Sequence, residues 1–278
     1  MRVSEANNCF LDYHRSNSKP HTVRNYELVL TKFCSQCGDR ELGSLNSDDI
    51  LTFLTQFTQG TKQSTKRLRY SLLSAFFNFI KNAVDPHCEN PCKTPILRKL
   101  FKNPKPAPWD IVEKEVVDEM IFRTDNVRNC LMLELMARGG MRVGEVLKLT
   151  PRDIEERELM LTDPKSGKAA EVDFIPQKVA DRLNTYIRDR AIGPSHRIFP
   201  ITYPAVRAVA KKAGRLVSIN LKTHDLRRHA ATYASRSGTP IEIVSKVILR
   251  HANLATTQRH LGKVSDTEAM RWIENLYG

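Results

Sequence analysis

The sequence predicts a mainly α-helical protein of two domains, in which the second domain also contains a small β-hairpin. Apolar residues recur at helical spacing through the first hundred residues, and a proline-rich segment follows them. Beyond that segment, short strand-like runs interrupt a further series of helices. We therefore place the domains at residues 1–101 and 111–278, joined by a linker over residues 102–110.

Three helices are expected in the first domain. Thr22 can cap a helix through TVRNYELVLTKF, because a side-chain oxygen at this place accepts free amide hydrogens. Asn46 or Ser47 starts a second helix, with acidic residues in its first turn, where the helix dipole favours them. The longest helix, from about Thr61 to Ala83, is basic in its first half and apolar in its second.

The basic half of that long helix is a candidate DNA-contacting surface. Its cations are Lys62, Lys66, Arg67 and Arg69. Side chains of this kind either contact phosphates or form a solvated face, and the sequence favours the two equally.

The linker is marked by proline. KNPKPAPW carries three prolines, which lack the amide donor and keep the preceding residues out of helical conformation. Such a segment is stiff and extended, which makes it the clearest domain boundary in the chain.

The second domain mixes helices with short strands. Runs at 158–162 and 170–175 flank PKSGK, whose Pro, Ser and Gly content is typical of a hairpin tip. Helices are expected at about 113–124, 127–137, 177–191, 203–213, 224–237, 241–249, 253–261 and from 265 onward.

Positive charge is spread over both domains. The formal net charge is +13, with +5 in residues 1–100 and +8 in residues 101–278. Two basic domains favour one polyanionic partner, and nucleic acid is the obvious candidate; the alternative is a charge that only maintains solubility. No apolar run approaches the roughly 20 residues of a spanning helix, and the N-terminus lacks the apolar core of a signal peptide. We expect a cytoplasmic protein.

The six cysteines are expected to be reduced thiols rather than metal ligands. Cys34 and Cys37 form one close pair, and Cys88 and Cys92 form another. Four thiolates could bind zinc, but the two pairs lie far apart in the chain and Cys34 falls within an amphipathic helix. We expect no metal site.

Five side chains that could bind or protonate a phosphate lie at expected helix ends or at the hairpin tip. Arg142 follows a Gly-Gly turn at a helix start, and Lys165 stands at the hairpin tip. His224 and Arg227 share one face near a helix N-terminus, while His251 lies between two helices. Together they could hold one phosphate, because guanidinium groups bind its oxygens while histidine and lysine transfer protons.

The stretches ARGGMRVGEVLKL, KSGK, HDLRRHAATYA and LRHANLATTQRHLG resemble, in order and spacing, the signature motifs of the tyrosine recombinases, which include phage integrases and Xer proteins. The resemblance covers essentially the whole chain. It implies a helical core-binding domain followed by a mixed α/β catalytic domain, together closing as a C-shaped clamp on double-stranded DNA. It also implies strand cleavage and rejoining through a covalent 3′-phosphotyrosyl bond, without metal or nucleotide cofactor, in a tetramer that passes through a Holliday junction.

The resemblance assigns roles to these phosphate-binding and proton-transferring side chains. Arg142 and Arg227 would bind the scissile phosphate, with Glu145 supporting Arg142. His224 would exchange a proton with the nucleophile, and His251 would add a hydrogen bond to the phosphate.

The general acid and two further arginines are assigned in the same way. Lys165 would protonate the departing 5′ oxygen, with Lys168 as its rival because the register of the hairpin is open. The HxxR spacing selects Arg227 over its neighbour Arg228. Arg228, like Arg250 at a place where the family usually has glycine, is either an extra phosphate contact or solvated surface.

The position of the family's nucleophilic tyrosine, nine residues after His251, is occupied by His260. Three interpretations stay open: a selected or engineered variant blocked at cleavage, a relative that only binds DNA, and an imidazole that itself attacks phosphorus. A fourth is attack by Tyr277, for instance in the site of a neighbour. The runner-up function is therefore a helical DNA-binding regulator that never cuts.

The C-terminal segment SDTEAMRWIENLYG is expected to form an amphipathic helix. Ala269, Trp272, Ile273 and Leu276 lie on one side of it. In the family such a helix docks on the next protomer, and the alternative is packing on its own domain.

Overall fold

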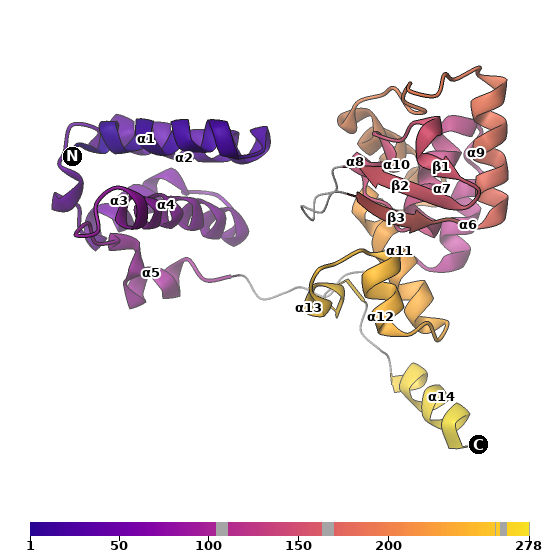
Figure 1. The fold of residues 1–278 in the computed structure, drawn as a ribbon. Coiled ribbons are helices and arrows are strands. Elements are labelled where there is room, and N and C mark those ends of the chain that lie inside the picture. The colour runs from indigo at the N-terminus through magenta and orange to yellow at the C-terminus, as the bar shows by residue number, and fades with distance from the viewer. Residues whose placement is uncertain (104–110, 163–169, 259, 262–265, 278) are drawn as a thin grey trace. The chain divides into compact units, whose positions relative to one another are not determined.

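The computed structural model describes residues 1–103, 111–162, 170–258, 260–261 and 266–277. The chain divides into two compact units, Met1–Ala107 (unit 1) and Pro108–Gly278 (unit 2) (Figure 1). Helices dominate both, and one small antiparallel sheet lies in unit 2, so the predicted fold class is confirmed. Within the described ranges, no helix has the length and apolar character needed to span a bilayer.

Unit 1 is built from helices. They are α1 (Val3–Asn17), α2 (Pro20–Cys37), α3 (Ser47–Phe57), α4 (Gln63–Ala83) and α5 (Pro95–Leu100), with short 3₁₀ turns at Leu42–Ser44 and Pro91–Lys93. Asn46 caps α3 as predicted, since its Oδ1 accepts the amides of Asp48 and Asp49 at 2.9 and 3.1 Å. The cap predicted at Thr22 is wrong: α2 starts at Pro20, whose fixed φ and missing amide suit a first helical position.

The core of unit 1 is aromatic. Phe10, Phe33, Phe53, Phe76 and Phe77 are all at most 2% exposed. Their rings meet mainly edge to face, as in the 5.5 Å contact between the centroids of Phe10 and Phe76. Unit 1 thus holds its helices together by apolar burial.

Unit 2 contains the longer list of elements. Its helices are α6 (Lys114–Phe122), α7 (Val127–Arg138), α8 (Val143–Val146), α9 (Gln177–Asp189), α10 (Tyr203–Leu216), α11 (Thr223–Arg236), α12 (Ile241–Ile243), α13 (Leu254–Gln258) and α14 (Asp266–Tyr277), with a 3₁₀ turn at Pro151–Asp153. Helix α7 is the central one, because every residue from Cys130 to Ala137 is buried and it packs against both α9 and α11.

The sheet has the order β1-β2-β3 and is antiparallel throughout. Its strands are β1 (Ile154–Glu155), β2 (Glu158–Thr162) and β3 (Ala170–Phe174). Thr162 pairs with Ala170, so β2 and β3 form the two arms of the predicted hairpin. The tip, with Lys165 and Lys168, lies outside the described residues.

The helix predicted over 241–249 is only partly correct. Three α-helical residues are followed by a π-helical turn, Val244–Ile248. The amide of Leu249 donates to the carbonyl of Val244 at 2.9 Å, a five-residue step that widens the turn. This wider turn leads directly into His251.

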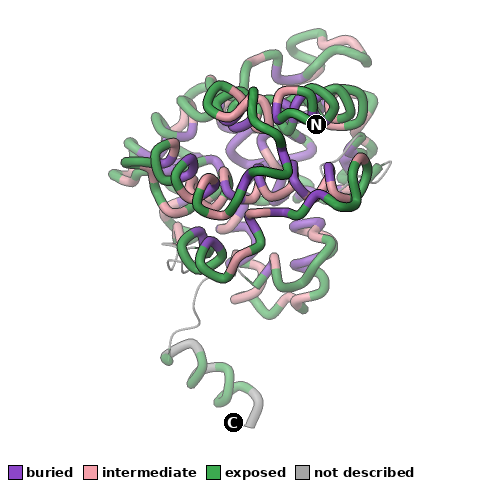
Figure 2. The backbone as a smooth tube through the Cα atoms, turned by 90° about the vertical axis from the view of Figure 1, so that its left-hand side faces the viewer, coloured by how far each residue is buried: buried purple, intermediate pink, exposed green. Residues whose placement is uncertain are grey.

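Helix α14 differs from the rest of unit 2 in its exposure. Every described side chain on it is exposed, as Figure 2 shows by its green colour. Among these are Met270, Trp272 and Ile273, at 66%, 39% and 58% exposure. An apolar helix face is thus open to solvent in the single chain.

Candidate active site

The Gly-Gly turn after α7 positions the first arginine. Gly140 has φ +70°, and a Cβ at this position would lie 2.9 Å from the carbonyl oxygen of Ile248. Only glycine tolerates both the left-handed backbone and this close approach. The turn places Arg142 at the N-cap of α8, where its backbone amide donates to Glu145 Oε2 at 2.7 Å and its Nη1 to Oε1 at 2.5 Å.

Arg227 lies one turn into α11 and is only 1% exposed. Its two Nη groups donate to the carbonyls of Gly140 and Leu249, while its Nε has no hydrogen-bond partner among the described residues. Burial lowers the pKa of Arg227 to about 9, and the charges of Arg142 and Arg250 act in the same direction. The guanidinium still carries its proton at neutral pH, so this is a buried cation with a free donor that an anion would satisfy.

Three histidines converge beside these arginines. His224 Nε2 lies 3.1 Å from His260 Nε2, and the ring centroids of His251 and His260 are 4.7 Å apart. The charges of Arg142 and Arg227 act on all three rings. Five predicted site residues from distant parts of the chain are therefore brought together.

Hydrogen bonds assign the tautomer of His260. Its Nδ1 lies 2.9 Å from the carbonyl oxygen of Thr256, which can only accept, so Nδ1 carries the hydrogen. In the neutral ring, Nε2 then holds a lone pair and accepts from the Nε2–H of His224. His260 thus presents an unprotonated nitrogen inside the cluster.

The electrostatics of the pocket keep these rings neutral. Desolvation lowers the pKa of His224 to about 4, with a further contribution from Arg228. Desolvation lowers the pKa of His251 to about 3, and Arg227 adds to it. Burial also lowers the pKa of His260, in spite of the opposing bond to Thr256. Each shift would be relieved by an anion, because a nearby negative charge favours imidazolium.

His251 is held by its own hydrogen bonds. Its backbone amide donates to the carbonyl of Ser245 at 2.8 Å, inside the π-helical turn. Its Nδ1 lies 3.0 Å from Thr257 Oγ1, which donates in turn to Ser245 Oγ at 2.8 Å. The π turn and α13 therefore orient this ring together.

Arg228 and Arg250 lie beside this cluster, and both are paired with acidic side chains. Lys165 and Lys168 lie outside the described residues. Arg228 is half-buried and its Nη1 donates to Asp225 Oδ1 at 2.9 Å. The sequence left Arg250 as either an extra phosphate contact or solvated surface, and its contacts fit neither: it is 5% exposed and paired with carboxylates.

The four cations at the start of α4, with Lys62 at its N-cap, belong to unit 1. Lys62 is exposed, while Lys66 is half-buried. Arg67 Nε donates to Asn103 Oδ1 at 3.3 Å. The guanidinium of Arg69 lies 4.0 Å from the ring centroid of Phe57 and donates to the same residue's carbonyl, so Arg69 is also part of the packing of unit 1.

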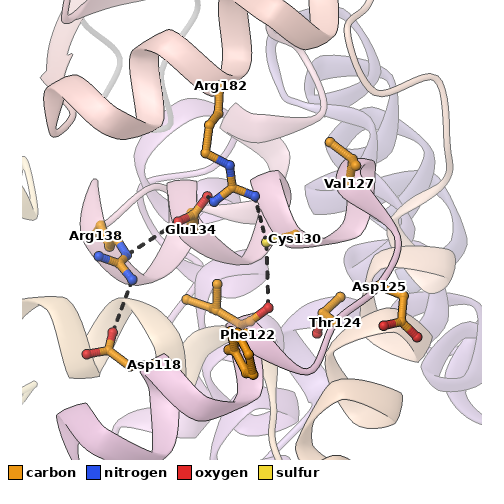
Figure 3. Close-up of a pocket in the computed structure, with 10 residues that line it drawn as sticks. Asp118, Phe122, Thr124, Asp125, Val127, Cys130, Glu134, Arg138 and Arg182 are labelled. Atoms are coloured by element: carbon orange, nitrogen blue, oxygen red, sulfur yellow. Dashed lines mark hydrogen bonds and ion pairs between the residues drawn. The ribbon is translucent and has the colours of Figure 1, made fainter.

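A surface pocket at α6, α7 and α9 contains none of these residues (Figure 3). Arg182 donates to Glu134 Oε2 at 2.6 Å and to Cys130 Sγ at 3.1 Å, and Arg138 pairs with Asp118 at 3.1 Å. The charged side chains of this pocket thus bind one another, which leaves the arginine–histidine cluster as the stronger anion site.

The described residues contain no group of His, Cys, Asp and Glu side chains that could hold a metal ion. All six cysteines are free thiols. Burial raises the pKa of Cys92 to about 12, which keeps it protonated.

Comparisons with known proteins match both units of the chain. Residues 111–264 match the phage integrase family, and residues 8–83 match the N-terminal SAM-like domain of phage integrases. The tyrosine recombinase XerA of Pyrococcus horikoshii is 28% identical over 276 residues, covering 93% of this chain and 90% of the relative. The tyrosine recombinase XerC of Actinobacillus pleuropneumoniae is 26% identical, covering 92% and 91%.

Solved structures share the fold. The Tn1549 transposon integrase in complex with transposon right end DNA has a TM-score of 0.75 at 17% identity, with all of both chains covered. A lambda integrase dimer bound to a COC′ core site has a TM-score of 0.73 at 15% identity, covering 96% of this chain and 100% of that one.

Proposed function

The chain belongs to the phage integrase family of tyrosine recombinases, a class of DNA breaking and rejoining enzymes, and we propose that it is a site-specific DNA recombinase. The observation that carries this proposal is the convergence of Arg142, Arg227 and the three histidines on one cationic pocket. A regulator that only bound DNA would have no need to bury an arginine with a free donor beside neutral imidazoles.

We assign the scissile phosphodiester to this pocket. Arg227 Nε would donate to one non-bridging oxygen, and Arg142 would bind another. Both cations would stabilise the charge of the pentacoordinate transition state. His251 would contribute a hydrogen bond, and Lys165, or Lys168 in its place, would protonate the 5′ oxygen that leaves.

His260 limits the chemistry of the chain as it stands. An imidazole is shorter than a phenol, and small errors of reach reduce attack steeply. The Nε2 lone pair of His260 is also engaged by His224 at 3.1 Å. We therefore propose that this chain binds and positions the phosphodiester but is impaired at cleavage, so that the covalent 3′ intermediate and the Holliday junction need a tyrosine at this position.

The partner in this proposal is a double-stranded recombination site. The related Tn1549 and lambda integrases are bound to DNA in their solved structures, and the positive charge is shared by both units. We propose that α4 of unit 1 contacts phosphates through Lys62, Lys66 and Arg67, with Arg69 supporting them, and that Arg228 adds a contact from unit 2.

We further propose a tetramer on DNA in which α14 docks on a neighbouring protomer. The exposed apolar side chains Met270, Trp272 and Ile273 support this, because such a face gains free energy when covered. A chain that ends at residue 265 is expected to bind DNA as single protomers. Assembly that is unchanged in native mass spectrometry would contradict exchange of the helix.

The test of function is His260→Tyr. DNA that the unaltered chain binds is first selected from a random library, and nicked duplexes of that sequence are offered to the variant. We expect a covalent protein–DNA adduct on denaturing gels with His260→Tyr, and none with the matched control His260→Phe, which lacks only the hydroxyl.

Two other outcomes would revise the proposal. A His260→Tyr chain that binds the same DNA but never becomes attached would favour the regulator. An adduct of the unaltered chain that is labile in acid and stable in alkali would identify a phosphohistidine, and would overturn the proposed impairment.

A further inference from the structure

Arg250 occupies an unusual place just behind the phosphate pocket. It has φ +48°, in the left-handed region where side chains are strained and glycine is preferred. Its side chain is nevertheless only 2% exposed. A strained, buried arginine persists only where its surroundings hold it, so its contacts indicate what it does.

Those contacts are carboxylates from two separate elements. Arg250 Nη1 lies 2.5 Å from Asp173 Oδ1 on β3, and its Nη2 lies 2.8 Å from Glu145 Oε2 on α8. Its Nε lies 3.8 Å from Glu171 Oε2, which is too long for a hydrogen bond but close enough for attraction. The three carboxylate side chains are 1%, 8% and 6% exposed, so water screens these pairs very little.

Glu145 connects Arg250 to the pocket. The same carboxylate accepts the backbone amide and the Nη1 of Arg142, and its Oε2 is shared between Arg142 and Arg250. Burial acts to raise the pKa of Glu145, but the charge of Arg250 and the bonds from Arg142 outweigh it, and the pKa lies below its ordinary value. Arg250 therefore helps keep Glu145 ionised, as it must be to hold Arg142.

A direct role for Arg250 on the phosphate does not fit these contacts. Its guanidinium is enclosed by three acids that would repel an anion, and it also donates to the carbonyl of Ile248 at 3.1 Å. The Nε of Arg250 lacks a hydrogen-bond partner among the described residues, as does the Nε of Arg227. The Nε of Arg250, however, lies 3.8 Å from Glu171 Oε2, and that carboxylate would repel an anion.

We propose that Arg250 is a positioning residue, which acts through Glu145 to hold Arg142 in the orientation that binds the scissile phosphate. The inference rests on the proposed function of the pocket. It also explains how an arginine is accommodated at a backbone position that favours glycine: the ion pair with Glu145 and the close contact with Asp173 offset the strain.

A double-mutant cycle tests this proposal with the unaltered residue at position 260. Affinity for the selected DNA is measured by fluorescence anisotropy for Arg250→Gly, for Arg142→Ala and for the two together. Glycine relieves the strained backbone and removes only the side chain. We expect Arg250→Gly to weaken binding about tenfold alone and less than twofold in the Arg142→Ala chain, because coupled residues are not additive.

The matched control is Arg182→Ala. It removes the closer of the two arginine partners of Glu134, whose side chain is 5% exposed. This pair lies in the pocket of Figure 3, where none of the phosphate-site residues lies. It is expected to lower the melting temperature like Arg250→Gly, while the affinity for DNA stays unchanged. General loss of stability is thereby separated from positioning.

The outcomes are distinct. Equal losses from Arg250→Gly in both backgrounds, or no loss in either, would overturn the role of Arg250 and leave the pocket intact. No loss from Arg142→Ala itself would instead remove the proposed function, and the inference with it. If the glycine variant does not fold, Arg250→Lys replaces it. An ammonium keeps the charge but lacks the planar fork that reaches Glu145 and Asp173 through separate nitrogens, so we expect about a threefold loss that again disappears without Arg142. No loss with lysine would overturn the proposal.

Discussion

The two units differ in the charge of the polar side chains that they bury. The polar side chains buried in the described part of unit 1 are neutral: Asn7, Thr58 and Asn90. Those buried in unit 2 include charged groups, namely Glu134, Glu145, Glu171, Asp173, Arg227 and Arg250. Unit 1 thus encloses apolar and neutral polar side chains, while unit 2 also encloses ions.

This difference indicates that the buried charges of unit 2 serve function more than stability. A buried ion pair often adds little net stability compared with apolar residues of the same size, because both ions lose their hydration. All of the buried ions but Glu134 lie at the arginine–histidine pocket or directly behind it. The residues around the arginine–histidine cluster are therefore the region where stability is lower in exchange for buried charge.

The largest expected effect is in unit 1. Phe76 is fully buried among Phe10, Phe33 and Phe77, so Phe76→Ala is expected to lower the free energy of unfolding by about 3–5 kcal/mol. Urea unfolding followed by circular dichroism measures this. Phe122→Ala is the control: Phe122 is 84% exposed, and a change near zero is expected. A loss below about 1 kcal/mol at Phe76 would contradict a core made by apolar packing.

A smaller effect is expected at the turn that supports the pocket. Gly140→Ala forces a Cβ against Ile248 at φ +70°, which is expected to cost about 1–3 kcal/mol. It also displaces the carbonyl that holds Arg227, so affinity for the selected DNA should fall. Gly144→Ala, with nothing within 4 Å of the new Cβ, should leave both stability and affinity nearly unchanged. Equal behaviour of the two variants would refute the role given to the turn.

The smallest effect is a loss of stability with rising pH, which comes from a buried carboxyl group of unit 2. Burial raises the pKa of Asp173 to about 7, although Arg250 opposes this. The folded protein then binds a proton that the unfolded chain releases near pH 4, so the contribution of Asp173 to stability is full below pH 4 and is lost as the pH rises through 7.

Asp173→Asn measures this contribution by difference. Between pH 6 and 7, the unaltered chain should lose about 1 kcal/mol of stability relative to the asparagine variant. The depressed pKa values of His224 and His251 act in the opposite direction, but they are common to both chains and cancel. Parallel curves for the two proteins would show that Asp173 stays ionised.

Much of the architecture follows from local signals in the sequence. Helical periodicity located α4 and α7, the cap at Asn46 located α3, and the change of period located the strands that pair at Thr162 and Ala170. The HxxR spacing put His224 and Arg227 on the first turns of α11. These features depend on neighbours a few residues apart, and such neighbours are visible in the chain itself.

Arg250 shows what only the tertiary structure decided. In the sequence it is one of many cations in a basic protein, and the neighbouring residues do not indicate its ion-pair partners. Its partners, Glu145 and Asp173, come from α8 and β3, and they meet it because the π turn packs against β3 while α8 packs against α7. Local patterns determine which segments are helices or strands, whereas the pairing of buried charges depends on which distant segments share the same dry space.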